Sequence, residues 1–287
     1  MDDARKHWRP GASPTLSVSD LVVEFPKHRE AVRVVDRVSL EVWPGEIVGI
    51  IGESGSGKTL TALSVLRMLP KRARVAGRIE LGQRSILEQS EREMQQLRGD
   101  RVAFIPQDAM RALNPTMKVG RQVGEPLNLH ERIPFRSAVA KATELLRSVH
   151  LRDPERRVEE FPHQFSGGMQ QRAMIAMGLA LQPELLIADE PTTALDVTVQ
   201  ARVLNLLKEI REEKGTSILF ITHDLGIVAE LCDWVYVMYR GKVVEDGPVD
   251  RIFNEPRNSY TRMLLAATPT ITHPSEVESR ELLEAQP

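Results

Sequence analysis

Two adjacent carboxylates, Asp189 and Glu190, follow directly on an apolar run at residues 185–188. A carboxylate at the end of a buried strand can hold Mg²⁺ through water, and a second one beside it can polarise a water molecule for attack on a phosphate. The simpler interpretation is that the pair caps a helix beginning near Pro191. We expect Asp189 to be a metal ligand and Glu190 to be a catalytic carboxylate.

A glycine-rich segment at residues 52–59 matches the pattern G-x-x-x-x-G-K-[ST] between a predicted buried strand and a predicted helix at 60–69. Such a loop turns backbone N–H groups toward a β-phosphate, while its lysine reaches the β and γ oxygens and its hydroxyl faces Mg²⁺. A plain glycine turn is the alternative, but the four fixed positions and their context favour nucleotide binding. The expected contacts are Gly52, Glu53, Ser54, Gly55, Ser56, Gly57, Lys58 and Thr59, with Lys58 also catalytic and Thr59 also a metal ligand.

Two further polar residues follow apolar runs. His223 comes after the run at 217–221, so it should emerge at the same sheet edge, as a donor to the γ-phosphate that also holds Glu190. Gln107 ends the apolar segment 102–106, and its amide is a candidate for contact with Mg²⁺ or the attacking water. Each has a simpler interpretation, as a structural histidine and an ordinary loop glutamine.

A serine and two glycines, Ser166, Gly167 and Gly168, precede a stretch with helical spacing. A helix that starts in this way offers a hydroxyl and backbone donors to a phosphate. Asp196 follows shortly after the acidic pair. The order of these groups indicates a nucleotide-driven protein.

The elements that position these residues alternate between strand and helix patterns. The runs at 46–51, 185–188 and 217–221 are apolar almost throughout, as in parallel strands covered on both faces. Residues 16–25 and 37–42 predict an antiparallel sheet, and 234–238 with 242–244 predict a hairpin. Helical spacing covers 136–149, 167–181 and 194–214, the last ended by Gly215, and a short helical extension reaches about residue 267.

Composition narrows the function classes. The 287 residues include 38 Lys and Arg and 40 Asp and Glu, which gives a net charge of −2. A chain with so little net charge shows no electrostatic indication of binding to nucleic acid. The single cysteine, Cys232, rules out an intrachain disulfide and makes a cysteine-ligated metal site implausible. No apolar run approaches the roughly 20 residues needed to cross a bilayer, so a transport role would require other subunits to supply the pore.

Taken together, residues 52–59, Gln107, 165–170, 185–190, 194–196 and His223 resemble the ATP-binding subunit of ABC transporters. The resemblance covers about residues 16–269. It implies an α/β P-loop NTPase fold, with a RecA-like core and parallel sheet, an antiparallel β subdomain and an ABC-type helical insert. The expected organisation is a flexible tail at 1–14, an ATPase domain at 15–268 with the insert at about 110–180 and a C-terminal extension at about 248–268, and a second flexible tail at 269–287.

The resemblance also implies partners and further site residues. It predicts a head-to-tail dimer, hetero- or homomeric, in which Ser166, Gly167 and Gly168 contact the partner's ATP and Asp196 couples the two sites. Phe25 matches the aromatic that stacks on adenine, although it could equally be a core residue. The family signature usually reads Leu-Ser-Gly-Gly-Gln, and Phe165 and Met169 depart from it without removing its phosphate-binding groups.

Finer similarity, in residues 105–110, 113–115, 190–198 and 258–262, points to importers of dipeptides, oligopeptides or nickel. It implies ATP and Mg²⁺ as cofactors, two permease subunits, an indirectly acting solute-binding protein, and a peripheral place on the cytoplasmic face of the plasma (inner) membrane. Some relatives carry a cysteine-rich segment linked to an iron–sulfur cluster, and the lack of those cysteines predicts no cluster here. The alternative is a soluble ABC-type ATPase that acts on ribosomes or DNA.

Overall fold

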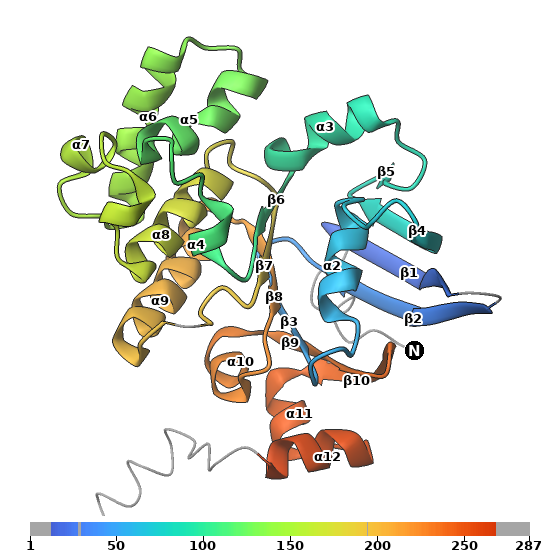
Figure 1. The fold of residues 1–287 in the computed structure, drawn as a ribbon. Helices are drawn as coiled ribbons and strands as arrows, with labels where there is room; N and C mark the ends of the chain where they lie inside the picture. The colour runs from blue at the N-terminus through green and yellow to red at the C-terminus, as the bar shows by residue number, and fades with distance from the viewer. Residues whose placement is uncertain (1–12, 28–29, 194, 268–287) are drawn as a thin grey trace, which may run out of the picture.

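Two sheets form the framework of the protein (Figure 1). The computed structural model describes residues 13–27, 30–193 and 195–267. The smaller sheet is antiparallel, in the order β2-β1-β4-β5. Its strands are β1 (Leu16–Lys27), β2 (Glu30–Val42), β4 (Arg74–Leu81) and β5 (Arg84–Ser85).

The larger sheet has the order β10-β9-β3-β8-β7-β6. Every neighbouring pair from β9 to β6 is parallel, and β10 closes one edge as an antiparallel strand. Its strands are β3 (Ile47–Ile51), β6 (Val102–Ile105), β7 (Leu185–Asp189), β8 (Ser217–Ile221), β9 (Trp234–Tyr239) and β10 (Lys242–Pro248).

The strand side chains alternate between two separate cores, as the twofold repeat of a strand requires. In β3, Ile47 and Ile51 join the core beneath the helical region, whereas Val48 and Ile50 join the core beneath the antiparallel sheet. Strands β7 and β8 alternate in the same way. A sheet covered on both faces explains why these strands are apolar at almost every position.

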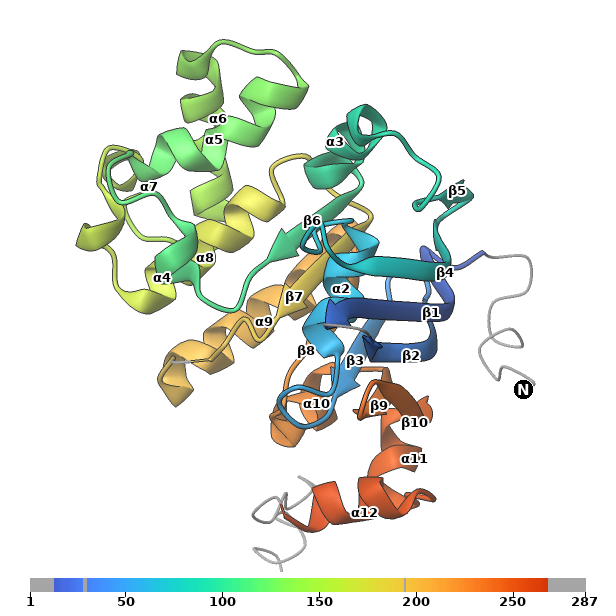
Figure 2. The ribbon, with the colours of Figure 1, turned by 45° about the vertical axis from the view of Figure 1, so that its right-hand side comes forward.

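Helices flank both faces of the larger sheet, and α2 and α8 lie on opposite sides of β6 and β7 in both views (Figures 1 and 2). The helices are α2 (Lys58–Val65), α3 (Glu91–Asp100), α4 (Ala109–Ala112), α5 (Val119–His130), α6 (Phe135–Ser148), α7 (Pro154–Arg157), the 3₁₀ turn η1 (Pro162–Gln164), α8 (Gly167–Gly178), α9 (Val197–Lys214), α10 (Leu225–Leu231), α11 (Val249–Asn254) and α12 (Ser259–Ala266). Among the described residues, none of these helices combines the length and apolarity needed to span a membrane.

Most expected elements are present, with shifted ends. The predicted helix at 60–69 begins earlier, at Lys58, and stops at Val65, because Arg67 adopts a left-handed backbone and Arg98 Nε donates to the freed carbonyl of Leu66 at 2.8 Å. The expected C-terminal extension is two helices, α11 and α12, instead of one. The predicted tails at 1–14 and 269–287 lie outside the described residues except for residues 13 and 14.

Candidate functional site

The glycine-rich loop joins β3 to α2 at the carboxyl edge of the larger sheet. Gly52 has a φ of 147°, and a Cβ there would lie 2.1 Å from the carbonyl oxygen of Met238. Gly57 has a φ of 103° and caps α2. Only glycine fits both positions, so the sequence pattern reflects the path of the backbone.

Lys58 turns back over this loop. Its Nζ donates to the carbonyls of Gly52 at 2.7 Å and Glu53 at 3.0 Å. Burial lowers the pKa of Lys58, while the nearby carboxylates of Glu190 and Asp189 act in the opposite direction. The buried hydroxyl of Ser56 has no hydrogen-bond partner within the described structure. An orphaned donor and a desolvated ammonium in a glycine-rich cradle fit the phosphates of a nucleotide.

Asp189 is the last residue of β7 and faces the same side as Leu185 and Ile187, toward α2. Its Oδ1 accepts a hydrogen bond from the Thr59 hydroxyl at 3.2 Å. Burial raises the pKa of Asp189, which the Thr59 contact partly offsets. A hydroxyl and a carboxylate at this spacing are the oxygen donors that Mg²⁺ prefers, with water and phosphate supplying the other ligands. The pair therefore fits a nucleotide-bound Mg²⁺.

Glu190 lies where three other segments meet. Its Oε1 lies 3.0 Å from Nδ1 of His223, and its Oε2 accepts from Gln107 Nε2 at 2.9 Å. The hydroxyl of Thr193 donates to the same Oε2 at 3.1 Å. The structure thus brings together the three side chains that the sequence singled out, from the segments that follow β6, β7 and β8. Thr193 was missed, because a threonine in a turn carries no distinctive sequence signal.

The backbone of Glu190 is in the left-handed region, with a φ of 46°. Its N–H donates to the carbonyl of Ile221 at the end of β8, at 2.8 Å. A non-glycine residue held in this region costs free energy that the surrounding contacts must offset. The turn redirects the chain after Asp189, so that two adjacent carboxylates have different hydrogen-bond partners.

Ser166 and Asp196 are both helix N-caps. Ser166 Oγ accepts from the N–H of Met169 at 3.4 Å at the start of α8, and Asp196 Oδ1 accepts from Val199 at 2.9 Å at the start of α9. The two starts pack closely, because a Cβ on Gly168 would lie 2.2 Å from Val199 Cγ1. Both capping side chains are exposed to solvent, so they are accessible to a ligand or a second subunit.

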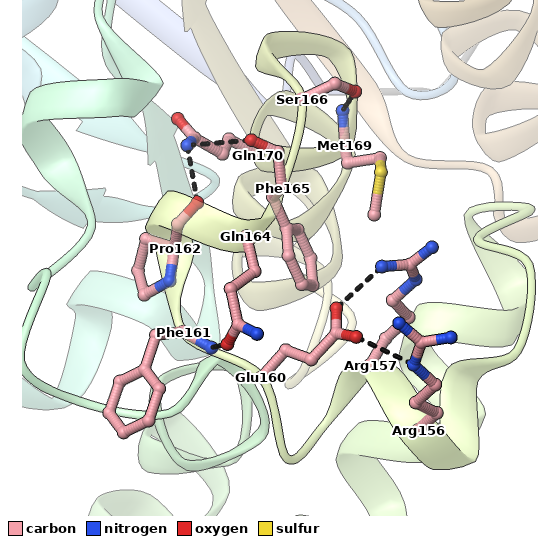
Figure 3. Close-up of polar contacts among 10 residues, drawn as sticks. All are labelled: Arg156, Arg157, Glu160, Phe161, Pro162, Gln164, Phe165, Ser166, Met169 and Gln170. Atoms are coloured by element: carbon pink, nitrogen blue, oxygen red, sulfur yellow. Dashed lines mark hydrogen bonds and ion pairs between the residues drawn. The ribbon is translucent and has the colours of Figure 1, made fainter.

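A compact turn leads into α8 (Figure 3). The buried side chain of Gln170 donates to the carbonyl of Pro162 at 2.7 Å, so the helix holds the turn that precedes it. Arg156 and Arg157 donate to the carboxylate of Glu160 at 2.9 and 2.6 Å. Arg157 and Arg156 lower the pKa of this carboxyl group, outweighing its burial. These contacts fix the position of Ser166 at the helix start.

Phe25 lies in β1, paired with Val32 of β2. It is partly buried against the core of the antiparallel sheet, and the guanidinium carbon of Arg72 lies 5.9 Å from the ring centroid. These contacts do not join Phe25 to the phosphate loop. Its role toward adenine therefore stays a prediction.

The sheet order, the phosphate loop and the acidic strand end define a P-loop ATPase. A model of the ABC transporter family matches residues 35–193, and the chain belongs to that family. It is 49% identical over 267 residues to a probable peptide ABC transporter ATP-binding protein of Sinorhizobium fredii, covering 92% of this chain and 80% of that protein. It is 48% identical over 269 residues to the oligopeptide transport ATP-binding protein OppD of Bacillus subtilis, covering 92% of this chain and 74% of that protein.

Solved structures share the fold. The ATP-binding cassette MJ0796, in a dimeric post-hydrolysis state bound to ADP and Pi, superposes with a TM-score of 0.72 at 26% identity. The superposition covers 82% of this chain and 98% of the cassette. The predicted fold class is confirmed, and so is the prediction of an ATP-hydrolysing ABC subunit.

Proposed function

We propose that this chain hydrolyses ATP to power the import of dipeptides or oligopeptides through separate membrane subunits. The observation that carries the chemistry is the placement of Glu190, held by Gln107 and His223 beside a loop that fits phosphates. The two relatives named above, a probable peptide transporter subunit and an oligopeptide transport subunit, support the cargo class. Nickel, the other cargo that the sequence suggests, has no comparable support.

Binding would use the loop at residues 52–59. Backbone N–H groups of a loop with this pattern and the positive start of α2 would favour the β-phosphate, and Lys58 would exchange its carbonyl partners for phosphate oxygens. Thr59 and Asp189 would hold Mg²⁺, with Gln107 a further ligand. When bound, this ion neutralises charge that develops on the phosphate oxygens.

Hydrolysis would then depend on Glu190. Its carboxylate orients a water molecule, whose oxygen forms a bond to the γ-phosphorus as the bond to the bridging oxygen of ADP breaks. His223 holds one carboxylate oxygen and is placed to donate to the γ-phosphate, and Gln107 holds the other oxygen. Lys58 balances charge on the leaving side. Gln107 and Thr193 both donate to the same oxygen of Glu190, which keeps the carboxylate in place.

A dimer would complete the site. The start of α8 lies on the opposite side of β6 and β7 from α2, which favours a role for Ser166, Gly167 and Gly168 at a partner's ATP (Figures 1 and 2). Asp196 caps the neighbouring helix, α9, and would couple the two ATP sites across the dimer interface. The dimeric state of the MJ0796 cassette supports this arrangement. The partner is a second ABC ATPase subunit, identical or not.

Contact with the membrane would run through the region after Gln107. Residues 108–120 include α4, and Ala109 of α4 and Leu113, which follows it, pack against Met174 of α8. A movement of Gln107 with the nucleotide would therefore be passed to the helical region. We place the chain peripherally on the cytoplasmic face of the plasma (inner) membrane, bound to two permease subunits and served by a solute-binding protein. Phe25 would stack on adenine.

The alternative, a soluble ATPase acting on ribosomes or DNA, gains no support, since the named relatives are transport subunits. Chromosomal Glu190→Gln cells are the test, with uptake of labelled dipeptides and oligopeptides measured beside uptake of labelled nickel. We expect peptide uptake to be lost and nickel uptake to be retained, and the chain to co-purify with membrane subunits. Loss of nickel uptake alone, or co-purification with ribosomes, would contradict the proposal.

A further inference from the structure

The first peptide of the phosphate loop is held from the far end of the chain. The N–H of Glu53 donates to the hydroxyl of Tyr260 at 3.1 Å, across 207 residues of sequence. Tyr260 belongs to α12, beyond residues 35–193 that match the family model. The helix lies at the same end of the molecule as the β9–β10 hairpin (Figures 1 and 2).

The same peptide anchors the loop lysine. The peptide that carries the Glu53 N–H also carries the carbonyl of Gly52, which accepts from Lys58 Nζ at 2.7 Å. The carbonyl of Glu53, in the next peptide, accepts from the same Nζ at 3.0 Å. The orientation of a peptide plane fixes its N–H and its C=O together, because the plane is rigid. Through this peptide, the Tyr260 hydroxyl helps to fix the position of Lys58, the residue expected to reach the β and γ oxygens of the nucleotide.

Tyr260 is itself fixed firmly. Its side chain is buried, and its ring packs on that of Tyr239 with centroids 4.2 Å apart. Asn258 caps the helix, its side chain accepting from the N–H of Tyr260 at 2.8 Å and donating to the carbonyl of Val244 at 3.2 Å. A hydroxyl on such a support can orient the group it contacts.

The start of α12 is in turn tied to β10. The carboxylate of Glu245 accepts from the N–H groups of Arg257 at 2.9 Å and Asn258 at 3.0 Å. Glu245 is buried, and charge-assisted bonds to backbone N–H groups are among the stronger ones in proteins. A continuous series of hydrogen bonds therefore links β10 through the start of α12 to Glu53.

A second contact holds a different part of the loop. The N–H of Gly241, in the β9–β10 turn, donates to the carbonyl of Ser56 at 3.0 Å. That contact supports the middle of the loop, whereas Tyr260 supports its beginning, next to both carbonyls that Lys58 contacts. The two contacts have separate roles, so the loss of one leaves the other in place.

We propose that Tyr260 is a positioning residue of the ATP site, whose hydroxyl orients the peptide between Gly52 and Glu53 and so presets Lys58 for the nucleotide phosphates. This inference rests on the proposed binding of ATP at residues 52–59. It assigns to the C-terminal extension a part in nucleotide affinity. Among the described residues, the hydroxyl of Tyr260 contacts the loop backbone and not Glu190, so we expect its effect to fall mainly on ATP affinity and less on the rate of hydrolysis.

The test compares two phenylalanine variants of the full chain. Tyr260→Phe removes the hydroxyl and keeps the ring. Tyr236→Phe is the matched control, since the hydroxyl of Tyr236 accepts from the N–H of Glu41 at 3.0 Å on the antiparallel sheet, another contact of the same kind. Affinity is measured by titration with a fluorescent ATP analogue in the presence of Mg²⁺ and by competition with ATP.

We expect Tyr260→Phe to weaken ATP binding about fivefold, the worth of one hydrogen bond, with the saturated hydrolysis rate within about twofold of the parent. Backbone hydrogen exchange in residues 52–56 should rise in this variant only. Tyr236→Phe should change neither. Unchanged affinity and exchange in Tyr260→Phe, or an equal loss of affinity in both variants, would overturn the inference.

The outcome for the parent chain separates this inference from the proposed function. If the unsubstituted chain fails to bind ATP, the proposed function fails. The exchange of residues 52–56 still reports whether the Tyr260 hydroxyl orders the loop. If Tyr260→Phe does not fold, Asn258→Ala is the second variant, because it removes the helix cap that fixes Tyr260. We expect Asn258→Ala also to weaken ATP binding. An affinity for ATP equal to that of the parent would count against the inference.

Discussion

His223 Nδ1 and Glu190 Oε1 lie 3.0 Å apart at the ends of two adjacent parallel strands, β8 and β7. The contact arises from strand order alone, because the two residues are 33 positions apart in sequence. It joins the candidate water-orienting carboxylate to the candidate γ-phosphate donor. The first prediction concerns this pair.

Substitution of His223 by alanine should lower the saturated rate of ATP hydrolysis by about 100-fold, as expected for the loss of one charge-stabilising donor. ATP affinity should change much less, since the loop at residues 52–59 supplies most phosphate contacts. Steady-state hydrolysis and ATP titration of the same preparation separate the two effects. A rate close to that of the parent would remove His223 from the mechanism.

Thr193 provides a smaller, graded test of how Glu190 is held. Its hydroxyl donates to Glu190 Oε2 at 3.1 Å. Thr193→Ala should lower the hydrolysis rate about fivefold, in line with one hydrogen bond of about 1 kcal/mol. Thr193→Ser keeps the hydroxyl and should behave like the parent. Equal rates for alanine and serine variants would show that this contact has no catalytic effect.

The packing of α8 on α9 predicts a difference between adjacent glycines. Gly168→Ala would place a methyl group 2.2 Å from Val199 Cγ1, whereas Gly167→Ala would place one at an ordinary 3.7 Å from Leu195. We expect the first to destabilise the protein by about 1–3 kcal/mol through overpacking, and the second to have little effect. Thermal unfolding measures both.

A double variant checks the cause. Val199→Ala removes the obstructing methyl groups and should recover much of the stability lost in Gly168→Ala. If Gly168→Ala alone is as stable as Gly167→Ala, the close approach of the two helices is wrong.

Glu160 predicts a dependence of stability on pH. Its hydrogen bonds to Arg157 and Arg156 lower its pKa in the folded protein. A carboxyl group with a lowered folded-state pKa stabilises the protein above its unfolded-state pKa, and this contribution is lost as pH falls through the folded-state value. Glu160→Gln should therefore lower the melting temperature at neutral pH, and the difference should shrink as pH falls below about 4.5.

The neighbouring Glu159 supplies the control. It pairs with Lys118 at 2.7 Å, but both side chains are about half exposed. Glu159→Gln should have little effect at any pH, because exposed ion pairs contribute little. A difference between Glu160→Gln and the parent that does not vary with pH would refute the electrostatic explanation.

The strands and the phosphate loop could be predicted because their patterns are local. Residues 217–221 form β8 as expected, and Asp189 ends β7 beside Thr59. The meeting of Glu190 and His223 was also predictable, since parallel strands end at one edge of a sheet. The same reasoning did not assign Val102–Ile105 to the parallel sheet, because a four-residue run is too short to show a period.

Contacts that depend on the folded path were not predictable. The left-handed turn at Glu190 is imposed by its N–H bond to Ile221 on the next strand. The Tyr260 contact with Glu53 requires α12 to be placed by Glu245, and neither residue type signals this. The predicted division at residues 110 and 180 and the role of Phe25 stay predictions.

The most direct test of the account is ATP turnover by Glu190→Gln in the assembled transporter. The variant keeps an oxygen acceptor toward His223 but cannot polarise water as a carboxylate does. We predict ATP affinity close to that of the parent and a hydrolysis rate lower by at least about 100-fold. A steady-state rate equal to that of the parent would contradict the assignment of Glu190 and, with it, the mechanism proposed here.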